Sequence, residues 1–273
     1  MEQVTNTVFW GILRESEHSP NRENDDAAIL KETGRVIREM TGAEVSIYQP
    51  EEIPDGVVLP DLVFFMCEKP EVLDRLDGLQ SRGVAMVNTP QSVRETYRYN
   101  TVKKLESFDF YPRTATLFTN DGNFNSFFPL WLKRFDFHAV TSEDVCQAKD
   151  AKDLKAKLAR FNERGIGQVL AQQHVEGDLI KFYGIGDRWF EYFYHKDQDL
   201  KSWPFDKSRL KDIARRGARE LGVEIFGGDA IVTQSGDIFL IDLNAWPSFA
   251  LYRSVASRHI AEHILDKIKK RSL

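Results

Sequence analysis

The chain has 273 residues, a formal charge of −5 at pH 7, and 42% hydrophobic against 29% charged residues. This composition is typical of a soluble globular protein, and the length allows one large sheet or several lobes around a cleft. Cys67 and Cys146 lie far apart and no Cys/His cluster surrounds either, which excludes a disulfide framework and a thiolate zinc site.

Partners of several kinds are disfavoured. The longest apolar run, 62–67, is too short to span a bilayer, and residues 1–3 do not begin an export signal. The mild acidic excess argues against a nucleic-acid partner. We therefore expect a cytoplasmic protein with a small-molecule substrate, without nucleic-acid or membrane partners; the oligomeric state is left open, with a homodimer among the alternatives.

The first ninety residues alternate apolar extended runs with helical stretches. Strands are predicted at 8–13, 45–48, 61–66 and 84–88, and helices at 24–40 and 71–81. Repetition of strand, helix and strand implies a parallel sheet. Pro90 fixes a turn after the last of these strands, so an N-terminal α/β domain is predicted over 1–90.

The remainder resembles two α+β lobes, over 91–167 and 168–273. The first holds helices at 91–107 and 151–164 and short strands at 115–118 and 130–133. In the second, successive antiparallel strands are predicted at 169–175, 179–185 and 188–194, joined by turns at Gly177 and Gly186. A helix at 207–221, strands at 230–233 and 238–243, and a helix at 254–270 complete it.

Oxygen ligands gather on the last predicted hairpin. Asp242 and Asn244 are two residues apart on one strand, so the pleat projects both side chains from the same face. Hairpin pairing can bring Asp229 beside them. Two carboxylates and an amide suit a hard cation such as Mg²⁺, with Mn²⁺ as an alternative. The competing interpretation of an Asp-x-Asn strand end is ordinary turn chemistry.

Two lysines on predicted strands strengthen the metal interpretation. Lys133 ends an apolar strand, and Lys181 lies among apolar and aromatic residues, although lysine is seldom buried without a partner. Two such lysines facing a metal set predict a site for a Mg²⁺-bound polyphosphate. Surface lysines with buried aliphatic stems are the alternative.

Together these blocks resemble the ATP-grasp superfamily, from about Asn88 to the C-terminal helix. The matching segments are Asn88-Thr89-Pro90 with the following helix, residues 110–114, Leu132-Lys133, residues 170–177, Lys181, and the hairpin that carries Asp229, Asp242 and Asn244. The resemblance implies an α/β ATP-grasp fold in which two α+β lobes clamp ATP next to an N-terminal parallel α/β domain.

The resemblance also implies roles for particular residues. Arg98, Lys133 and Lys181 would contact the ATP phosphates, and a hinge strand would contact adenine through Gln172, Gln173, His174 and Val175. Three departures are visible: residues 134–142 contain no glycine, whereas many members have a Gly-rich flap; the hinge has Gln172-Gln173 where Gln-Glu is common; and Asp242 replaces the more frequent Glu.

Two reaction branches remain. In RimK-like and glutathione synthetase-like ligases a carboxylate takes the γ-phosphoryl group and an amine then displaces phosphate, whereas in the inositol trisphosphate kinase branch a hydroxyl keeps it. Lys133 followed by His138, and Asp before Asn, resemble the kinase branch locally. The mixed charge of residues 14–26 suits an amino-acid or peptide acceptor better, which favours the ligase.

Further side chains are candidates for the acceptor site. His138 could relay a proton or cap a turn, and an arginine could bind a carboxylate or form a surface ion pair. A non-catalytic ATP-binding module is the third alternative. The candidate substrate residues are Arg14, Arg22, Arg134, Ser248 and Arg253.

Overall fold

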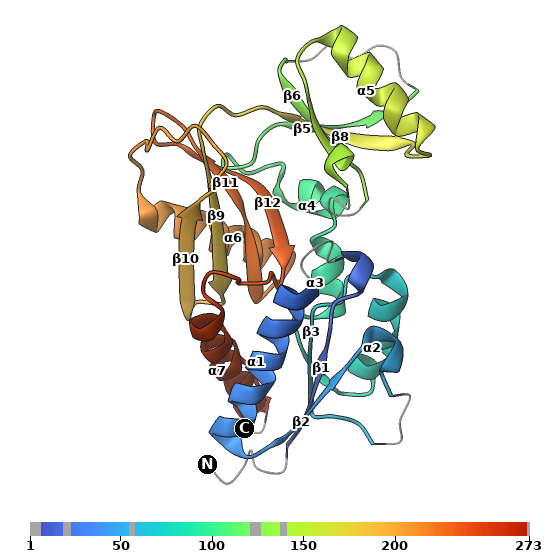
Figure 1. Ribbon diagram of the computed structural model, residues 1–273, viewed down its shortest axis with the longest axis vertical. Helices are drawn as coiled ribbons and strands as arrows, with labels where there is room; N and C mark the ends of the chain where they lie inside the picture. The colour runs from blue at the N-terminus through green and yellow to red at the C-terminus, as the bar shows by residue number, and fades with distance from the viewer. Residues whose placement is uncertain (1–6, 19–22, 55–57, 121–126, 137–140, 272–273) are drawn as a thin grey trace.

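The described residues form three four-stranded sheets (Figure 1). The computed structural model describes residues 7–18, 23–54, 58–120, 127–136 and 141–271. No helix among these residues is long and apolar enough to cross a membrane.

The first sheet is parallel, as predicted, with the strand order β2-β1-β3-β4. Helix α1 packs against α7, and their apolar faces form one core with strand residues such as Phe9 and Phe64. Short 3-10 helices η1 (Ser16–His18) and η2 (Pro50–Glu52) follow β1 and β2. The main elements are β1 (Val8–Ile12), α1 (Glu23–Thr41), β2 (Glu44–Tyr48), β3 (Leu62–Phe65), α2 (Pro70–Ser81) and β4 (Ala85–Val87).

The second sheet is antiparallel, with the order β5-β8-β6-β7. Helix α5 (Ala151–Glu163) buries Leu154, Leu158 and Phe161 against it. The sequence did not predict β7, a four-residue strand that follows the 3-10 helix η3 (Ser142–Asp144). The strands are β5 (Thr114–Phe118), β6 (Leu130–Arg134), β7 (Val145–Ala148) and β8 (Gln168–Gln173).

The third sheet is also antiparallel and has the order β10-β9-β11-β12. Helix α6 packs against β12 and β9. Helix α7 contacts β9 and also packs against α1, beside the first sheet (Figure 1). The elements are β9 (Asp178–Ile185), β10 (Trp189–Tyr194), α6 (Lys207–Leu221), β11 (Ile225–Val232), β12 (Ile238–Ala245) and α7 (Arg253–Arg271).

The predicted antiparallel pairing of β8 with β9 is wrong, because the two strands belong to different sheets. Gly177 is not the turn of a hairpin. A Cβ there would lie 2.2 Å from the carbonyl oxygen of Val232 on β11, so close backbone approach requires the glycine. Since β8 pairs with β5 and β6, we propose a unit boundary within 174–177 in place of the predicted boundary at 167.

The single helix predicted at 91–107 is two helices, α3 (Pro90–Glu95) and α4 (Arg98–Leu105). Polar side chains take the last carbonyl groups of α3 and so replace the helical bonds that would continue it. Thr96 Oγ1 donates to Val93 O at 2.7 Å, and Asn100 Nδ2 donates to Arg94 O at 2.9 Å. This break makes Arg98 the first residue of α4.

Asn88, directly after β4, joins the first sheet to the third. Its Oδ1 accepts hydrogen bonds from the backbone N–H groups of Glu224 (2.7 Å) and Ile225 (2.9 Å), and its Nδ2 donates to Ile225 O at 2.8 Å. The side chain is fully buried. It therefore acts as a strand partner for the start of β11.

Candidate active site

Three charged side chains lie side by side on neighbouring strands of the third sheet. Asp229 on β11 is directly opposite Lys181 on β9 and directly opposite Asp242 on β12. Lys181 Nζ donates to both carboxylate oxygens of Asp229, at 2.8 and 3.0 Å. Lys181 and Asp242 are 61 positions apart in the sequence, and the antiparallel pairing of the strands brings them together.

Asn244 adds an amide oxygen to this set, and the residues fit a divalent cation. Asn244 Nδ2 is 3.4 Å from Asp242 Oδ2, while its Oδ1 is buried and has no hydrogen-bond partner within the described ranges. Burial raises the pKa of Asp229, Lys181 opposes this, and Asp242 adds to it. A bound cation would relieve that cost and give the amide oxygen a partner.

The number of acidic ligands is small. Within the described part of the chain no group of three or more His, Cys, Asp or Glu side chains is arranged to hold a metal ion. Two carboxylates and an amide are compatible with Mg²⁺, which commonly keeps waters and substrate phosphates as its other ligands.

Lys133 approaches this hairpin from the second sheet. Its Nζ donates to Gln172 Oε1 and to the backbone oxygen of Ile241, both at 2.8 Å, and so bridges the two antiparallel sheets. Burial lowers the pKa of Lys133 to about 8, with Asp242 opposing and Arg98 assisting the shift. A buried ammonium group beside other charges is suited to binding an anion.

Arg98 supplies a second buried cation. The residue is 7% exposed, its Nε has no hydrogen-bond partner among the described residues, and its Nη1 is 3.5 Å from the backbone oxygen of Arg134. Burial lowers the pKa of Arg98, and the nearby Asp242 opposes that effect. A guanidinium group with an unused N–H can donate a hydrogen bond to a phosphate oxygen.

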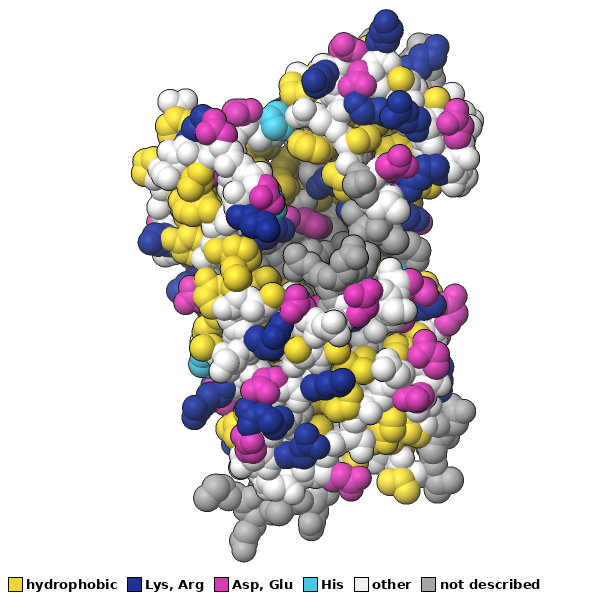
Figure 2. All heavy atoms as spheres, in the orientation of Figure 1, with side chains coloured by type: hydrophobic (Ala, Val, Ile, Leu, Met, Phe, Trp, Pro, Cys, Tyr) yellow, Lys and Arg dark blue, Asp and Glu magenta, His cyan; other side chains and the backbone are white. Residues whose placement is uncertain are grey.

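A pocket between the second and third sheets is lined by three of these charged groups, Arg98, Lys133 and Asp242. Figure 2 shows the surface hollowed where these parts of the molecule meet. Tyr111, Thr101 and Thr114 belong to the lining and were not singled out from the sequence, although Tyr111 and Thr114 lie in the 110–114 block. The lining residues are Arg98, Thr101, Val102, Tyr111, Thr114, Lys133, Leu170, Gln172, Ile241 and Asp242.

The hinge strand uses several of its polar groups internally. Gln172 Oε1 accepts from Lys133, and Gln172 Nε2 donates to Thr114 Oγ1 at 3.2 Å. The N–H groups of Gln173 and His174 donate to Arg113 O and Pro129 O. The His174 ring accepts from Trp131 Nε1 at 3.0 Å. The expected adenine contact by the Gln172 side chain therefore competes with its hold on Lys133. Val175 follows β8 between the two sheets.

The candidate substrate residues do not form one cluster. Arg134 pairs with Asp136 and Asp144 in the unit of the second sheet. Arg253 pairs with Asp25 at the start of α1, and the buried Ser248 lies in the loop after β12. Arg14 contacts the end of β12. Arg22 and His138 lie outside the described residues.

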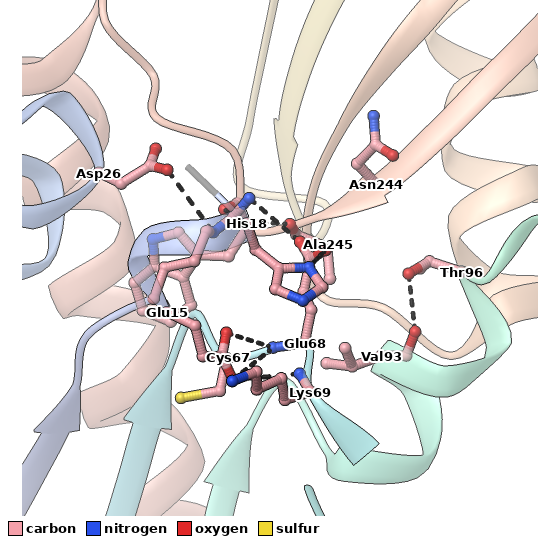
Figure 3. A network of polar contacts seen from close by, with 12 residues as sticks. Glu15, His18, Asp26, Cys67, Glu68, Lys69, Val93, Thr96, Asn244 and Ala245 are labelled. Carbon is pink, nitrogen blue, oxygen red and sulfur yellow. Dashed lines mark hydrogen bonds and ion pairs between the residues drawn. The ribbon is translucent and has the colours of Figure 1, made fainter. Parts of the chain in front are cut away.

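The network around Arg14 lies at the carboxyl edge of the first sheet. Figure 3 shows Glu68 and Asp26 near Ala245, at the end of β12. Arg14 forms ion pairs with Glu68 (3.1 Å) and Asp26 (3.6 Å), and the His18 ring is 3.7 Å from the other oxygen of Glu68. A hydrogen bond to Glu68 raises the pKa of His18. Positive and negative groups are mixed at this edge.

Comparison with known proteins finds the same fold. No family model and no curated protein sequence matches the chain. Among solved structures, a RimK domain ATP-grasp protein of Sphaerobacter thermophilus aligns with a TM-score of 0.68 at 16% identity, covering 94% of this chain and 99% of that one. A D-alanine–D-alanine ligase of Bacillus anthracis complexed with ATP aligns with a TM-score of 0.72 at 13% identity, covering 97% and 98%.

A third similar structure is the ATP-grasp ligase PsnB complexed with minimal precursor, Mg and ADP, with a TM-score of 0.65 at 16% identity and coverage of 98% and 99%. These likenesses extend over nearly the whole chain and include all three sheets. The chain has the ATP-grasp fold, as the sequence blocks predicted.

Proposed function

We propose that the protein is a MgATP-dependent carboxylate–amine ligase. The observation that carries the proposal is the meeting of opposite charges at one pocket: Arg98, Lys133 and Asp242 line it, and Asp229 lies directly opposite Asp242 on the neighbouring strand. Such an arrangement suits a polyphosphate with its metal ion. Similar folds occur in an ATP complex of D-alanine–D-alanine ligase and in an Mg and ADP complex of PsnB.

In this proposal different residues bind the phosphates, the metal ion and the adenine of ATP. Lys133 and Arg98 bind phosphate oxygens and orient the γ-phosphoryl group, and Lys181 balances the charge of Asp229. Asp229, Asp242 and Asn244 would hold Mg²⁺, which when bound neutralises charge on the β- and γ-phosphates. Gln173, His174 and Val175 border the space we assign to adenine.

The proposed reaction has two balanced steps. An acceptor carboxylate oxygen attacks the γ-phosphorus, the bond to the β-phosphate oxygen breaks, and ADP leaves. A neutral amine then attacks the acyl carbon, the carbon–oxygen bond to phosphate breaks, and the nitrogen loses a proton as the amide forms. Inorganic phosphate is released.

The described residues at the edge of the first sheet favour a ligase over a kinase. Both arginines there are paired with acids, Arg14 with Glu68 and Asp26, and Arg253 with Asp25. A polyphosphorylated hydroxyl acceptor needs a strong excess of cations. A mixed-charge edge is better matched to a small amino-acid-like or peptide acceptor.

The test is ADP formation by the purified protein with MgATP and a panel of amino acids, dipeptides and inositol phosphates. We expect an amino acid or peptide pair to accelerate ADP formation with an equal amount of free phosphate. ADP without free phosphate, and a phosphorylated acceptor, would establish the kinase. No acceleration by any acceptor would favour a binding module.

The metal set is tested by Asp242→Ala, with Asp237→Ala in the turn of the same hairpin as the matched control. Loss of Asp242 removes one of the two carboxylates, so turnover should fall by about 100-fold or more. Asp237 is half exposed and bonds to Ser235 in the turn, so its variant should retain turnover. Equal turnover in both variants would refute the metal assignment.

A further inference from the structure

The guanidinium group of Arg14 connects the first sheet to the end of the metal hairpin. Arg14 Nη2 donates to the backbone oxygen of Trp246 at 2.7 Å and lies 3.5 Å from that of Ala245. These two residues directly follow Asn244. The Arg14 side chain is only 13% exposed, so its charge and donors are directed into the protein.

Other residues fix the position of this guanidinium. Glu68 and Asp26 pair with it from the β3–α2 connection and from α1. The Glu15 carboxylate accepts the backbone N–H groups of Glu68 (3.1 Å) and Lys69 (3.1 Å), which holds the connection that carries Glu68. Arg14 is therefore held by Asp26 and Glu68 from two elements while it contacts the end of β12.

The backbone at Trp246, two residues after Asn244, has a conformation that its contacts must maintain. Trp246 has a φ of 31°, in the left-handed region that a residue with a Cβ rarely adopts. Its N–H donates to Ile225 O at 2.9 Å, and Arg14 bonds its carbonyl group, so both sides of this residue are fixed. Strained backbone persists where the surroundings determine it.

The Asn244 side chain has little support of its own. Among the described residues its side chain makes a long 3.4 Å approach to Asp242, and its buried Oδ1 has no hydrogen-bond partner there. Its direction therefore depends mainly on the backbone that carries it. Asn244 and Ala245 pair with Gly227 and Phe226 of β11, and Arg14 fixes the chain just beyond this pairing through the carbonyl group of Trp246.

We propose that Arg14 is a positioning residue for the metal site, holding the end of β12 so that the Asn244 amide oxygen faces a cation bound by Asp229 and Asp242. This inference rests on the proposed function for the identity of the metal ligands. It replaces the sequence-based assignment of Arg14 to acceptor binding. The first sheet thereby contributes to metal affinity in the third.

The test measures metal linkage rather than turnover. Calorimetry gives the affinity for ADP with saturating Mg²⁺ and with EDTA, and the ratio of the two reports the metal contribution. We expect Arg14→Met to lower this ratio about tenfold, as loss of an outer-shell partner does, with the affinity in EDTA unchanged. Arg14→Lys, which keeps the charge but has a single donor nitrogen in place of the guanidinium fork, should give an intermediate ratio.

Matched variants separate positioning from general destabilisation. Arg75 also donates to two backbone oxygens, those of Pro50 and Ile53, away from the metal site, so Arg75→Met should lower thermal stability and leave the ratio unchanged. Asn244→Ala should lower the ratio, and adding Arg14→Met to it should lower it no further, because both act through one ligand.

The outcomes distinguish this inference from the proposed function. A wild-type ratio of one would contradict the metal site itself. A normal wild-type ratio that is unchanged in Arg14→Met would overturn the positioning role alone. If Arg14→Met leaves the ratio unchanged but raises the KM for the acceptor, Arg14 would instead be assigned to acceptor binding. Additive losses in the double variant would also contradict action through Asn244.

Discussion

The surroundings of the Lys133 ammonium group shift its pKa in opposite directions. Burial and Arg98 favour its neutral form, while Asp242 and Asp229 favour the charged form. Its two hydrogen bonds, to Gln172 and to Ile241 O, orient it between the sheets. With a pKa of about 8, Lys133 is charged in most molecules at pH 7 and loses its charge within the accessible alkaline range.

We therefore expect ADP affinity in EDTA to fall as pH rises from 7.5 to 9.5. Neutral Lys133 does not attract phosphate, so above pH 8 binding must take up a proton and affinity should fall by up to about tenfold per pH unit. Tyr111, beside the same pocket, has its pKa raised above this range by burial. Calorimetry at a series of pH values measures the effect.

The control is Lys133→Arg, whose guanidinium stays protonated over the whole interval. Its ADP affinity should be nearly flat with pH, whatever its absolute value. A flat profile in the unaltered protein, or the same decline in the arginine variant, would show that another group titrates.

For single residues, the sequence was most informative where a charged side chain stands on an apolar strand. The positions of Lys133, Lys181, Asp229 and Asp242 on apolar strands led to the prediction of a phosphate and metal site. The strand register brings the last three of them together. Gln172 illustrates the limit. Its bond to Lys133 depends on the pairing of β8 with β6, which local sequence does not encode.

The β11–β12 hairpin is the element on which the candidate metal set depends, and a glycine sets its spacing. A Cβ at Gly228 would lie 2.2 Å from the backbone oxygen of Asp242 and 2.7 Å from the Phe182 ring. Backbone atoms cannot yield as a flexible side-chain end can. The glycine therefore allows β12 to approach closely beside Asp229.

Gly228→Ala should reduce the free energy of unfolding by about 1–3 kcal/mol through overpacking. Gly78→Ala in α2 is the matched change, because a Cβ there meets nothing within 4 Å, and it should add about 0.5–1 kcal/mol. Urea unfolding of the two variants measures both. A Gly228 variant as stable as the unaltered protein would contradict the close packing of the hairpin.

Elements were predicted well where periodicity is long and poorly where tertiary contacts decide. Helix α6 begins and ends at the predicted residues, with Asp206 accepting bonds from Ser208 and Arg209 at its start and Gly222 in the left-handed region at its end. By contrast, Gly177 had the local signal of a turn, but the requirement comes from β11. Only the folded chain distinguishes these two uses of glycine.

The whole molecule depends on contacts between segments that are remote in sequence. Helix α7 was predicted as a helix, yet its packing against α1 was not, although this contact buries Ile260 and Ile264 with the first sheet. An amphipathic pattern shows that a helix has an apolar face without identifying the surface that covers it. The relation between first and third sheets therefore had to come from the structure.

Asn88 tests how tightly those two sheets are coupled. Asn88→Ala would leave the backbone N–H groups of Glu224 and Ile225 without their acceptor, while Ile225 O keeps the bond from the Trp246 N–H, so the free energy of unfolding should fall by about 3 kcal/mol. Asn100→Ala, which removes one hydrogen bond to Arg94 O, should cost about 1 kcal/mol.

Denaturant unfolding followed by circular dichroism and by tryptophan fluorescence provides the measurement. Trp246, one of five tryptophans, is fully buried next to Phe64 of the first sheet and follows β12 of the third, so with the other four replaced by phenylalanine its emission reports their contact. In Asn88→Ala we expect the fluorescence transition to occur at lower denaturant than the loss of helical signal, because the sheets separate first. Coincident transitions at the unaltered midpoint would show that Asn88 is not needed to hold the two sheets together.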